Sequence, residues 1–326
     1  MKIWSLLPSA TEILFALGLG DEITGVTHEC DYPPEANGKR RVTVSYIDST
    51  QDSGEIDRQV TERFKAGRQL YGIDEERLRS DPPDFIVTQD LCPVCAVSPS
   101  DFEGHMEEAG CGARVMCLNP NRLGDVLENI REVGGATGRM QEAADLVASL
   151  ERRKDAVCTA TADATRRRVL ALEWLDPPMP AGHWVPEMIE MAGGTRGPIA
   201  PGEPSRKVPW EEMRAIDPEI VVLMPCGFGP ERAAREAEVL WRLDGWSRLP
   251  AFGKGRVYAV DGNAYFSRPG PRLVDGLEML AHIFHPELFR KMPPLGSVLK
   301  LVSPPAGASS VENWTPRFER LLAGVS

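Results

Sequence analysis

The residue pair best suited to bind a metal ion lies just after a short apolar segment. Cys92-Pro93-Val94-Cys95 has the CxxC spacing that suits a metal ion, an iron–sulfur centre or a redox dithiol. Structural zinc sites normally use a second pair of ligands, and the sequence holds no other CxxC. Metal ligation by Cys92 and Cys95 is therefore one hypothesis, and packing of two small side chains in a tight loop is the alternative.

Thiol, imidazole, carboxylate and aromatic groups also follow several segments that we predict to be strands, at residues 23–27, 85–88, 169–172, 220–224 and 257–260. In open α/β sheets, ligands bind beyond the carboxyl ends of the strands, where loops vary and helix N-termini point towards the ligand. We therefore expect these groups to converge on one edge. The candidate ligand-binding residues are His28, Glu29, Cys30, Tyr32, Gln89, Asp90, Cys92, Glu173, Trp174, His183, Trp184, Cys226, Phe228, Tyr265 and Phe266.

Four aromatic residues in this set have no spacing that would turn them towards a core. Trp174 and Trp184 follow one predicted strand, and Tyr265 and Phe266 follow another. Aromatic rings in such loops favour a flat, largely apolar ligand. The alternative is that the rings fill space above the lobe beneath them.

The predicted strands alternate with helices, which indicates parallel βαβ units. Further strands are predicted at 3–7 and 114–118, and helices at 125–133, ending at Gly134-Gly135, and from about 139 to about 159. No glycine or proline interrupts the longer helix, so we interpret it as a stiff connector. The predicted parts are an N-terminal lobe (1–121), a helical connector (122–160), a C-terminal lobe (161–290) and an extension over the surface (291–326).

The N-terminus resembles a signal peptide in charge and hydrophobicity, but Pro8 and Glu12 interrupt its apolar segment. A capping box explains the pattern better: Ser9 caps a helix, and Glu12 reaches back to the N–H of the cap. Gly18 and Gly20 then end the helix. The expected location is cytoplasmic for the sequence as it stands, and periplasmic if a leader was removed.

The overall composition narrows the choice of partner. The 48 acidic residues exceed the 37 basic ones and give a net charge of −11. This charge repels phosphate groups, so we expect no nucleic-acid partner, and the lack of a long apolar run predicts no membrane insertion. Seven scattered cysteines, an odd number, are typical of reduced thiols.

A short pattern recurs in the two halves. Glu76 precedes Pro83-Asp84 and a predicted strand, and Glu211 precedes Pro218-Glu219 and another strand at the same interval. The repeat indicates two related lobes. A common helix-to-strand connection that recurs by chance is the alternative.

Five segments carry a resemblance to a known family. SLLPSATEILFALGLGDEITGVTHECDYPPEA, EERLRSDPPDFIVTQDLC, LEWLDPPMPAGHWVPEMIEMAGG, VPWEEMRAIDPEIVVLMPCGF and GRVYAVDGNAYFSRPGPRLVDGLEML are similar to the periplasmic cobalamin- and iron-chelate-binding proteins that serve ABC importers. The resemblance implies an α/β fold of two Rossmann-like lobes with parallel sheets, joined by one long rigid helix. It also implies a binding protein that is not an enzyme and needs no cofactor.

The family resemblance further implies a ligand and a partner. The ligand would be a corrinoid or related metal chelate held between the lobes. It would be delivered to the membrane subunit of an ABC importer or handed over inside the cell. Glu76 and Glu211 match the glutamates that pair with arginines of that subunit, although surface glutamates are common. The chain departs from the family where His28-Glu29-Cys30 and Gln89-Asp90-Leu91-Cys92 replace aromatic residues. The alternative function is a cytosolic redox protein or enzyme whose cysteines hold a metal or an iron–sulfur centre.

Overall fold

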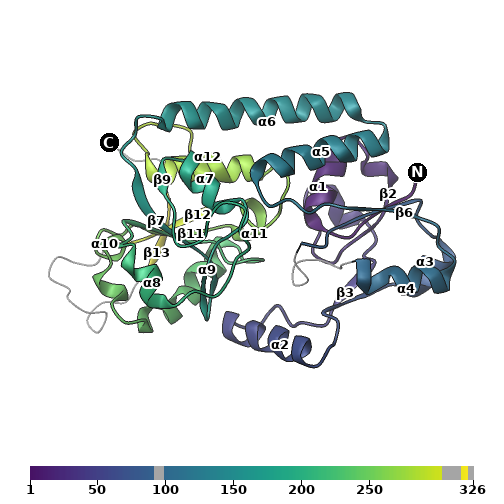
Figure 1. Cartoon of the computed structure of the whole chain (residues 1–326), viewed down its shortest axis with the longest axis horizontal. Coiled ribbons are helices and arrows are strands. Elements are labelled where there is room, and N and C mark those ends of the chain that lie inside the picture. The colour runs from purple at the N-terminus through teal and green to yellow at the C-terminus, as the bar shows by residue number, and fades with distance from the viewer. Residues whose placement is uncertain (92–98, 303–316, 322–326) are drawn as a thin grey trace. The chain divides into compact units, whose positions relative to one another are not determined.

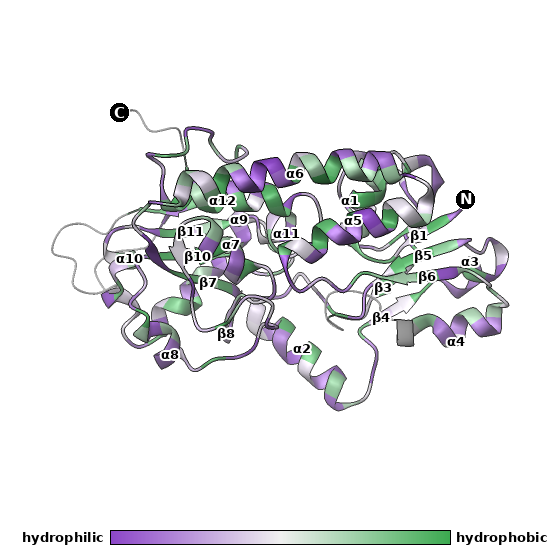
Figure 2. Cartoon of the chain, turned by 45° about the horizontal axis from the view of Figure 1, so that its top comes forward, coloured by the Kyte–Doolittle hydropathy of each residue, from purple (hydrophilic) through white to green (hydrophobic). Residues whose placement is uncertain are grey.

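The computed structural model describes residues 1–91, 99–302 and 317–321 of the chain. It divides into two compact units (Figure 1). Unit 1 comprises Met1–Pro120 and Gly124–Ser149, and unit 2 comprises Asn121–Leu123 and Leu150–Ser326. The helix α6 (Met140–Thr161) contains the division between residues 149 and 150, and it carries both hydrophobic and hydrophilic turns along its length (Figure 2).

Unit 1 is built on a four-stranded parallel sheet. The strand order is β2 (Ile23–Val26), β1 (Ile3–Ser5), β5 (Phe85–Thr88) and β6 (Arg114–Cys117). All three neighbouring pairs are parallel. This confirms the strands that the apolar segments predict and the α/β class of the first lobe.

The two faces of this sheet are covered by different elements. Trp4 and Ile86 lie in a buried cluster with Leu78 of α3 (Glu75–Ser80) and Met106 of α4 (Pro99–Ala109). Successive strand residues point to opposite faces, so Ser5 faces the other side. There the Thr11 hydroxyl of α1 (Pro8–Ala16) donates to the Ser5 hydroxyl oxygen at 2.7 Å.

The predicted capping box at the start of α1 is wrong. Leu7 is the N-cap, with extended backbone and no side-chain cap, and Pro8 is the first helical residue. Proline fits this position because its fixed φ suits a helix and its missing N–H would have no helical partner. Ser9 and Glu12 therefore lie inside the helix and are buried. The predicted end is confirmed, because Gly18 has φ +74° and the Leu19 N–H donates to the Leu14 carbonyl oxygen in a Schellman motif.

A small antiparallel pair lies beside the main sheet of unit 1. It consists of β3 (Thr43–Ser45) and β4 (Tyr71–Ile73), and α2 (Ser53–Lys65) connects them. Asp52 caps α2 by accepting from the Glu55 N–H. Short 3-10 turns lie at Gly20–Glu22 and Pro34–Gly38.

The helix α5 (Leu123–Thr137) runs through Gly134 and Gly135, so the prediction that these glycines end it is wrong. The helix ends at Thr137, and Gly138 follows with φ +74°. Gly134 has a packing role, because a Cβ there would lie 2.4 Å from the Cβ of Ala143 and 2.9 Å from the Arg139 carbonyl oxygen. The predicted second helix is confirmed as α6, which begins one residue later than expected.

Unit 2 holds a larger, mixed sheet. Its path is β13 (Phe318–Arg320), β12 (Val298–Leu301), β11 (Val257–Val260), β10 (Ile220–Leu223), β7 (Arg167–Leu175) and β8 (Pro178–Pro180), with β9 (Gly194–Thr195) also on β7. The pairs β7–β10 and β10–β11 are parallel, whereas β8, β12 and β13 are antiparallel to their neighbours. The prediction of a purely surface extension after residue 291 is wrong, because β12 buries Val298 and Leu301 in the sheet.

The central strands of unit 2 are buried on both faces. On one face, Leu170, Val221 and Val257 pack in a cluster with Trp246 and Met213. The helices and 3-10 turns on this side are α8 (Trp210–Ala215), α9 (Pro230–Glu236), Ala237–Arg242, Trp246–Arg248 and α10 (Pro250–Gly253). The remaining helices of unit 2 are α7 (Val185–Met191), α11 (Gly262–Tyr265) and α12 (Leu273–Phe284).

Candidate functional site

In unit 1, the predicted residues lie on both sides of the carboxyl end of β1. His28 to Tyr32 follow β2, and Gln89 and Asp90 follow β5, the two neighbours of β1 in the parallel sheet. The N-terminus of α1 follows β1 between them. The sheet therefore brings these segments to one edge, as the sequence predicts.

His28 is the most constrained of these residues. Its backbone N–H donates to the Thr43 hydroxyl oxygen at 3.1 Å, and its Nδ1 lies 2.8 Å from the same oxygen. Its ring lies 5.5 Å from that of Tyr71. Burial lowers the pKa of His28 below its ordinary value, so the imidazole is neutral at physiological pH. A neutral, oriented imidazole is suited to hydrogen bonding or metal ligation.

The other predicted residues of unit 1 differ in accessibility. Cys30 is fully buried, and its sulfur lies 3.0 Å from the Thr11 hydroxyl of α1, which is a packing position. Gln89 is also buried. Glu29, Tyr32 and Asp90 are exposed. The Asp90 N–H donates to the Asn119 side-chain oxygen at 2.7 Å, which ties the segment after β5 to the one after β6.

In unit 2, backbone hydrogen bonds join the segments that carry the predicted residues. The Cys226 N–H donates to the Glu173 carbonyl oxygen at 3.1 Å, and the Asn263 N–H donates to the Phe228 carbonyl oxygen at 3.2 Å. The Trp184 indole N–H donates to the Phe266 carbonyl oxygen at 2.8 Å. Four segments that lie far apart in the sequence therefore meet at the carboxyl edge of this sheet.

Glu173 and Trp174 lie within β7 and not in a loop after it, which corrects the sequence-based placement. The strand continues because its last residues pair with β8, and the register shifts between Leu172 and Trp174. Such an irregularity breaks the alternation of side chains and redirects them, and it is common beside functional sites.

Glu173 carries a largely buried carboxyl group. Its Oε2 accepts a long hydrogen bond of 3.4 Å from the Gly182 N–H. Burial raises the pKa of Glu173 above its ordinary value. The neutral acid form, which is favoured by this shift, is able to donate a hydrogen bond to a ligand.

Replacing Glu173 with glutamine is expected to stabilise the ligand-free protein at neutral and alkaline pH. With a raised pKa, the folded wild type binds the Glu173 proton more tightly than the unfolded chain. The stability that this proton contributes is complete below the unfolded pKa and is lost as pH rises through the folded pKa. Each tenfold difference in proton affinity between the folded and unfolded states changes the free energy of unfolding by about 1.36 kcal/mol. Thermal melts of wild type and Glu173→Gln should coincide near pH 4 and separate above neutrality. The exposed Glu212→Gln is the control, and equal melts at every pH would contradict the prediction.

His183 and Trp184 lie at the turn before α7. His183 has φ 54°, an uncommon left-handed conformation for a non-glycine residue, and its N–H donates to the Glu203 carbonyl oxygen at 2.6 Å. Burial lowers the pKa of its imidazole. Trp184 is only 6% exposed and Phe266 only 2%. Both rings therefore fill space inside unit 2, as in the alternative given for these aromatic residues. This position leaves them little surface to offer a ligand.

Trp174 and Tyr265 retain partial exposure, and each lies near a second group. The Trp174 ring lies 5.4 Å from that of Phe228, at a tilt of 55°. The guanidinium of Arg232 lies 3.6 Å from the centre of the Phe228 ring, and that of Arg272 lies 5.7 Å from the Tyr265 ring. Sequence reasoning missed both arginines. Arg232 lies in the first turn of α9 and Arg272 is the N-cap of α12, so their place at the start of helices that follow the aromatic loops was the available signal.

The two predicted docking glutamates occupy equivalent positions. Glu76 is the second residue of α3 and Glu211 the second residue of α8, and β5 and β10 begin nine residues after them. Both side chains are exposed. In the described part of the chain, neither carboxylate has an ion-pair partner. Cys92 and Cys95, the predicted metal pair, lie outside the described residues.

The fold and these edges define a two-unit α/β protein of the kind that binds ligands at the carboxyl ends of parallel strands. A model of the periplasmic binding protein family matches residues 3–264. The chain therefore belongs to the periplasmic binding protein family, and the family resemblance of the sequence is confirmed.

Individual relatives agree with this membership. An uncharacterized ABC transporter substrate-binding lipoprotein, YvrC of Bacillus subtilis, is 27% identical over 89% of this chain and 82% of its own length. The crystal structure of the periplasmic vitamin B12 binding protein BtuF of Vibrio cholerae matches 87% of this chain and 96% of its own, with a TM-score of 0.64 and 21% identity. The periplasmic heme-binding protein RhuT from Roseiflexus sp. RS-1 matches 88% and 99%, with a TM-score of 0.65 and 23% identity. At these identities the two structures establish the fold.

Proposed function

We propose that this protein captures a corrinoid, such as cobalamin, or a related metal chelate, and delivers it to the membrane subunit of an ABC importer. The observation that carries the proposal is the convergence of Glu173, Trp174 and the Cys226–Phe228 segment at the carboxyl edge of the unit 2 sheet, in a member of the periplasmic binding protein family. Relatives named for vitamin B12 and heme binding support this ligand class.

The chemistry of the unit 2 edge suits a large, flat ligand with polar groups at its periphery. Trp174 is partly exposed and offers aromatic surface, which favours contact with a macrocycle, and the buried Phe228 packs against it. Glu173 and His183 are held towards their neutral forms by burial, so they offer hydrogen bonds without a full charge. Amide groups at the rim of a corrin ring fit such partners.

Delivery would use Glu76 and Glu211. Each presents an exposed carboxylate without an internal partner in the described residues, at the same position of a first helical turn. A carboxylate accepts two parallel hydrogen bonds from one guanidinium, which makes arginines the natural counterpart. The proposed partner surface therefore carries two arginine sites.

Titration of the purified protein with cobalamin, cobinamide and haem tests the ligand class. We expect saturable binding of one chelate per chain. Absorption spectroscopy and calorimetry would measure this binding. Cobinamide lacks the lower nucleotide of cobalamin, so a comparison of the two shows whether that part is recognised. Binding of none of the three would overturn the proposal.

The comparisons lend no support to the alternative of a redox protein or an iron–sulfur enzyme. The proposal accordingly assigns no reaction and no resident cofactor to the chain. Anaerobic purification followed by metal analysis and an absorption spectrum would test that alternative directly. Cluster absorption bands that vanish in the Cys92→Ser, Cys95→Ser variant would favour it.

The compartment determines which partner receives the ligand. Among the helices of the described residues, none is long and apolar enough to cross a bilayer. Detection of the protein in periplasmic or cytoplasmic fractions of its native host would decide between an importer and an intracellular acceptor as the recipient.

A further inference from the structure

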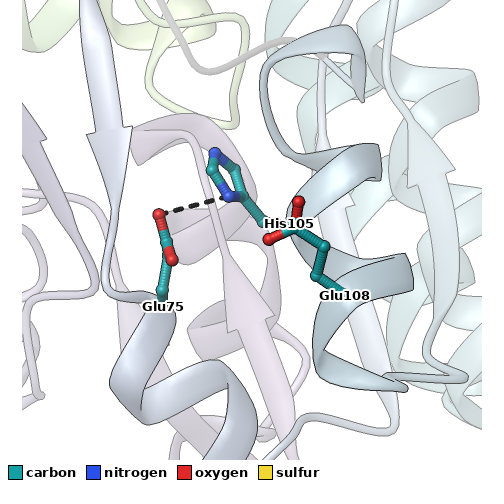
Figure 3. Close-up of side chains that lie close together, drawn as sticks. All are labelled: Glu75, His105 and Glu108. Atoms are coloured by element: carbon teal, nitrogen blue, oxygen red, sulfur yellow. Dashed lines mark ion pairs between the residues drawn. The ribbon is translucent and has the colours of Figure 1, made fainter.

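Three potential metal ligands converge in unit 1, next to the exposed Glu76. Glu75 is the first residue of α3, and His105 and Glu108 lie three apart on α4, so one face of α4 presents both. One nitrogen of His105 and one oxygen from each carboxylate all lie within 4.8 Å of one another (Figure 3). Glu75 and His105 are half-buried and Glu108 is exposed, so the cluster is open to solvent.

The charges of this cluster are incompletely balanced. The Oε1 of Glu75 lies 3.2 Å from Nδ1 of His105, and its Oε2 accepts from Arg79 at 2.7 Å. Glu108 has no ion-pair partner among the described residues. Two carboxylates therefore lie near one imidazole, and among the residues that the structure describes the cationic side chain paired with them is Arg79, on the far oxygen of Glu75. Glu75 and His105 alone would form an ordinary surface ion pair, and Glu108 adds a second carboxylate to it.

We propose that Glu75, His105 and Glu108 bind a divalent transition-metal ion, with Zn²⁺ as the ion to test. One imidazole nitrogen and two carboxylate oxygens are a ligand set that zinc accepts, with water in the fourth position. Calcium and magnesium are less suited, because they prefer oxygen ligands throughout. Tetrahedral bonds of about 2.0–2.1 Å place ligand atoms roughly 3.3 Å apart, so small side-chain rotations would close the present arrangement.

The second oxygen of Glu75 supports this assignment. Arg79 holds Oε2 from the next turn of α3, which fixes the carboxylate plane and leaves Oε1 directed at His105. Partners of this kind orient ligands around bound metals. The ion would link α3 to α4, and its site lies one residue from the proposed docking residue Glu76. This site does not depend on the nature of the ligand that the protein captures.

Calorimetric titration of the full chain with Zn²⁺, with no affinity tag and after treatment with a chelator, tests the proposal. The titration is made in wild type and in a Cys92→Ser, Cys95→Ser background, which removes the other candidate ligands. We expect about one Zn²⁺ per chain in the Cys92→Ser, Cys95→Ser background, and at least a tenfold weaker affinity after His105→Gln or Glu108→Gln.

Glu107→Gln is the matched control, since Glu107 is an exposed glutamate on the same helix and outside the cluster. Its Zn²⁺ affinity should equal that of the parent. Absence of Zn²⁺ binding in the Cys92→Ser, Cys95→Ser background would overturn the proposal, as would equal affinities of the parent and His105→Gln. Circular dichroism of each variant verifies that the fold is retained. Because chelate capture is measured separately with cobalamin or haem, a failure here leaves the proposed function standing.

Discussion

Replacing both Glu76 and Glu211 with lysine is expected to abolish delivery of the ligand to the importer and to leave ligand affinity unchanged. Each replacement puts a cation opposite a proposed arginine, so attraction becomes repulsion at both docking points. Loss of one partner of a buried, hydrogen-bonded charge pair costs about 2–5 kcal/mol. Two such losses correspond to at least a thousandfold weaker association, which uptake of labelled ligand or co-purification of the membrane subunit would detect.

Several controls separate docking from folding. Lysine in the first turn of a helix opposes the helix dipole and costs roughly 0.3–1 kcal/mol, so the Glu76→Gln, Glu211→Gln variant is measured as well and should be impaired to a lesser degree. Glu212→Lys carries the same charge change at the neighbouring exposed position of α8 and should deliver normally. Added salt should weaken wild-type docking. Normal uptake by the double lysine variant would exclude the two glutamates as docking points.

The strands and the family could be predicted from the sequence because their signals are local. Short apolar runs such as 85–88 and 257–260 match β5 and β11 at both ends. The start of α1 could not be predicted with the same rules. Ser9 and Glu12 satisfy the spacing of a capping box, but the proline before them fixes a helical φ and moves the helix start to Pro8. The prediction that Gly134 ends a helix was wrong for a related reason: close packing against Ala143 explains a glycine at this position inside α5.

The candidate site depends more on tertiary contacts, so the sequence predicted its location better than the role of each side chain. Parallel pairing carries the segments after β7, β10 and β11 to one edge, and this followed from the strand pattern alone. The burial of each side chain did not follow from the strand pattern. Trp174 and Trp184 look alike in sequence, yet only Trp184 donates its indole N–H to the Phe266 carbonyl oxygen and is almost fully covered. The contact of Arg232 with Phe228 likewise depends on a fold that brings a helix over a loop.

Trp174 is the half-exposed tryptophan at the unit 2 edge, so its truncation is expected to weaken chelate binding more than any other single change there. The centre of its ring lies 5.4 Å from that of Phe228, and its side chain is partly exposed. Removing a buried aromatic anchor from a binding site commonly costs at least 2 kcal/mol, which corresponds to roughly a thirtyfold loss of affinity. We expect Trp174→Ala to show this loss in calorimetric titrations with whichever chelate the wild type binds. Trp174→Phe should keep much of the affinity, because it retains an aromatic face.

Trp241 provides the matched control for Trp174. It is also a half-buried tryptophan of unit 2, but it packs edge-on against Phe252 and beside Trp246 in the core cluster on one face of the sheet. Trp241→Ala should therefore lower the melting temperature and leave chelate affinity unchanged. Wild-type affinity in Trp174→Ala, or an equal loss in Trp241→Ala, would show that the ligand does not rest on this aromatic pair. Because the two variants lose the same side chain from the same unit, a difference in affinity between them can only come from the place that each ring occupies.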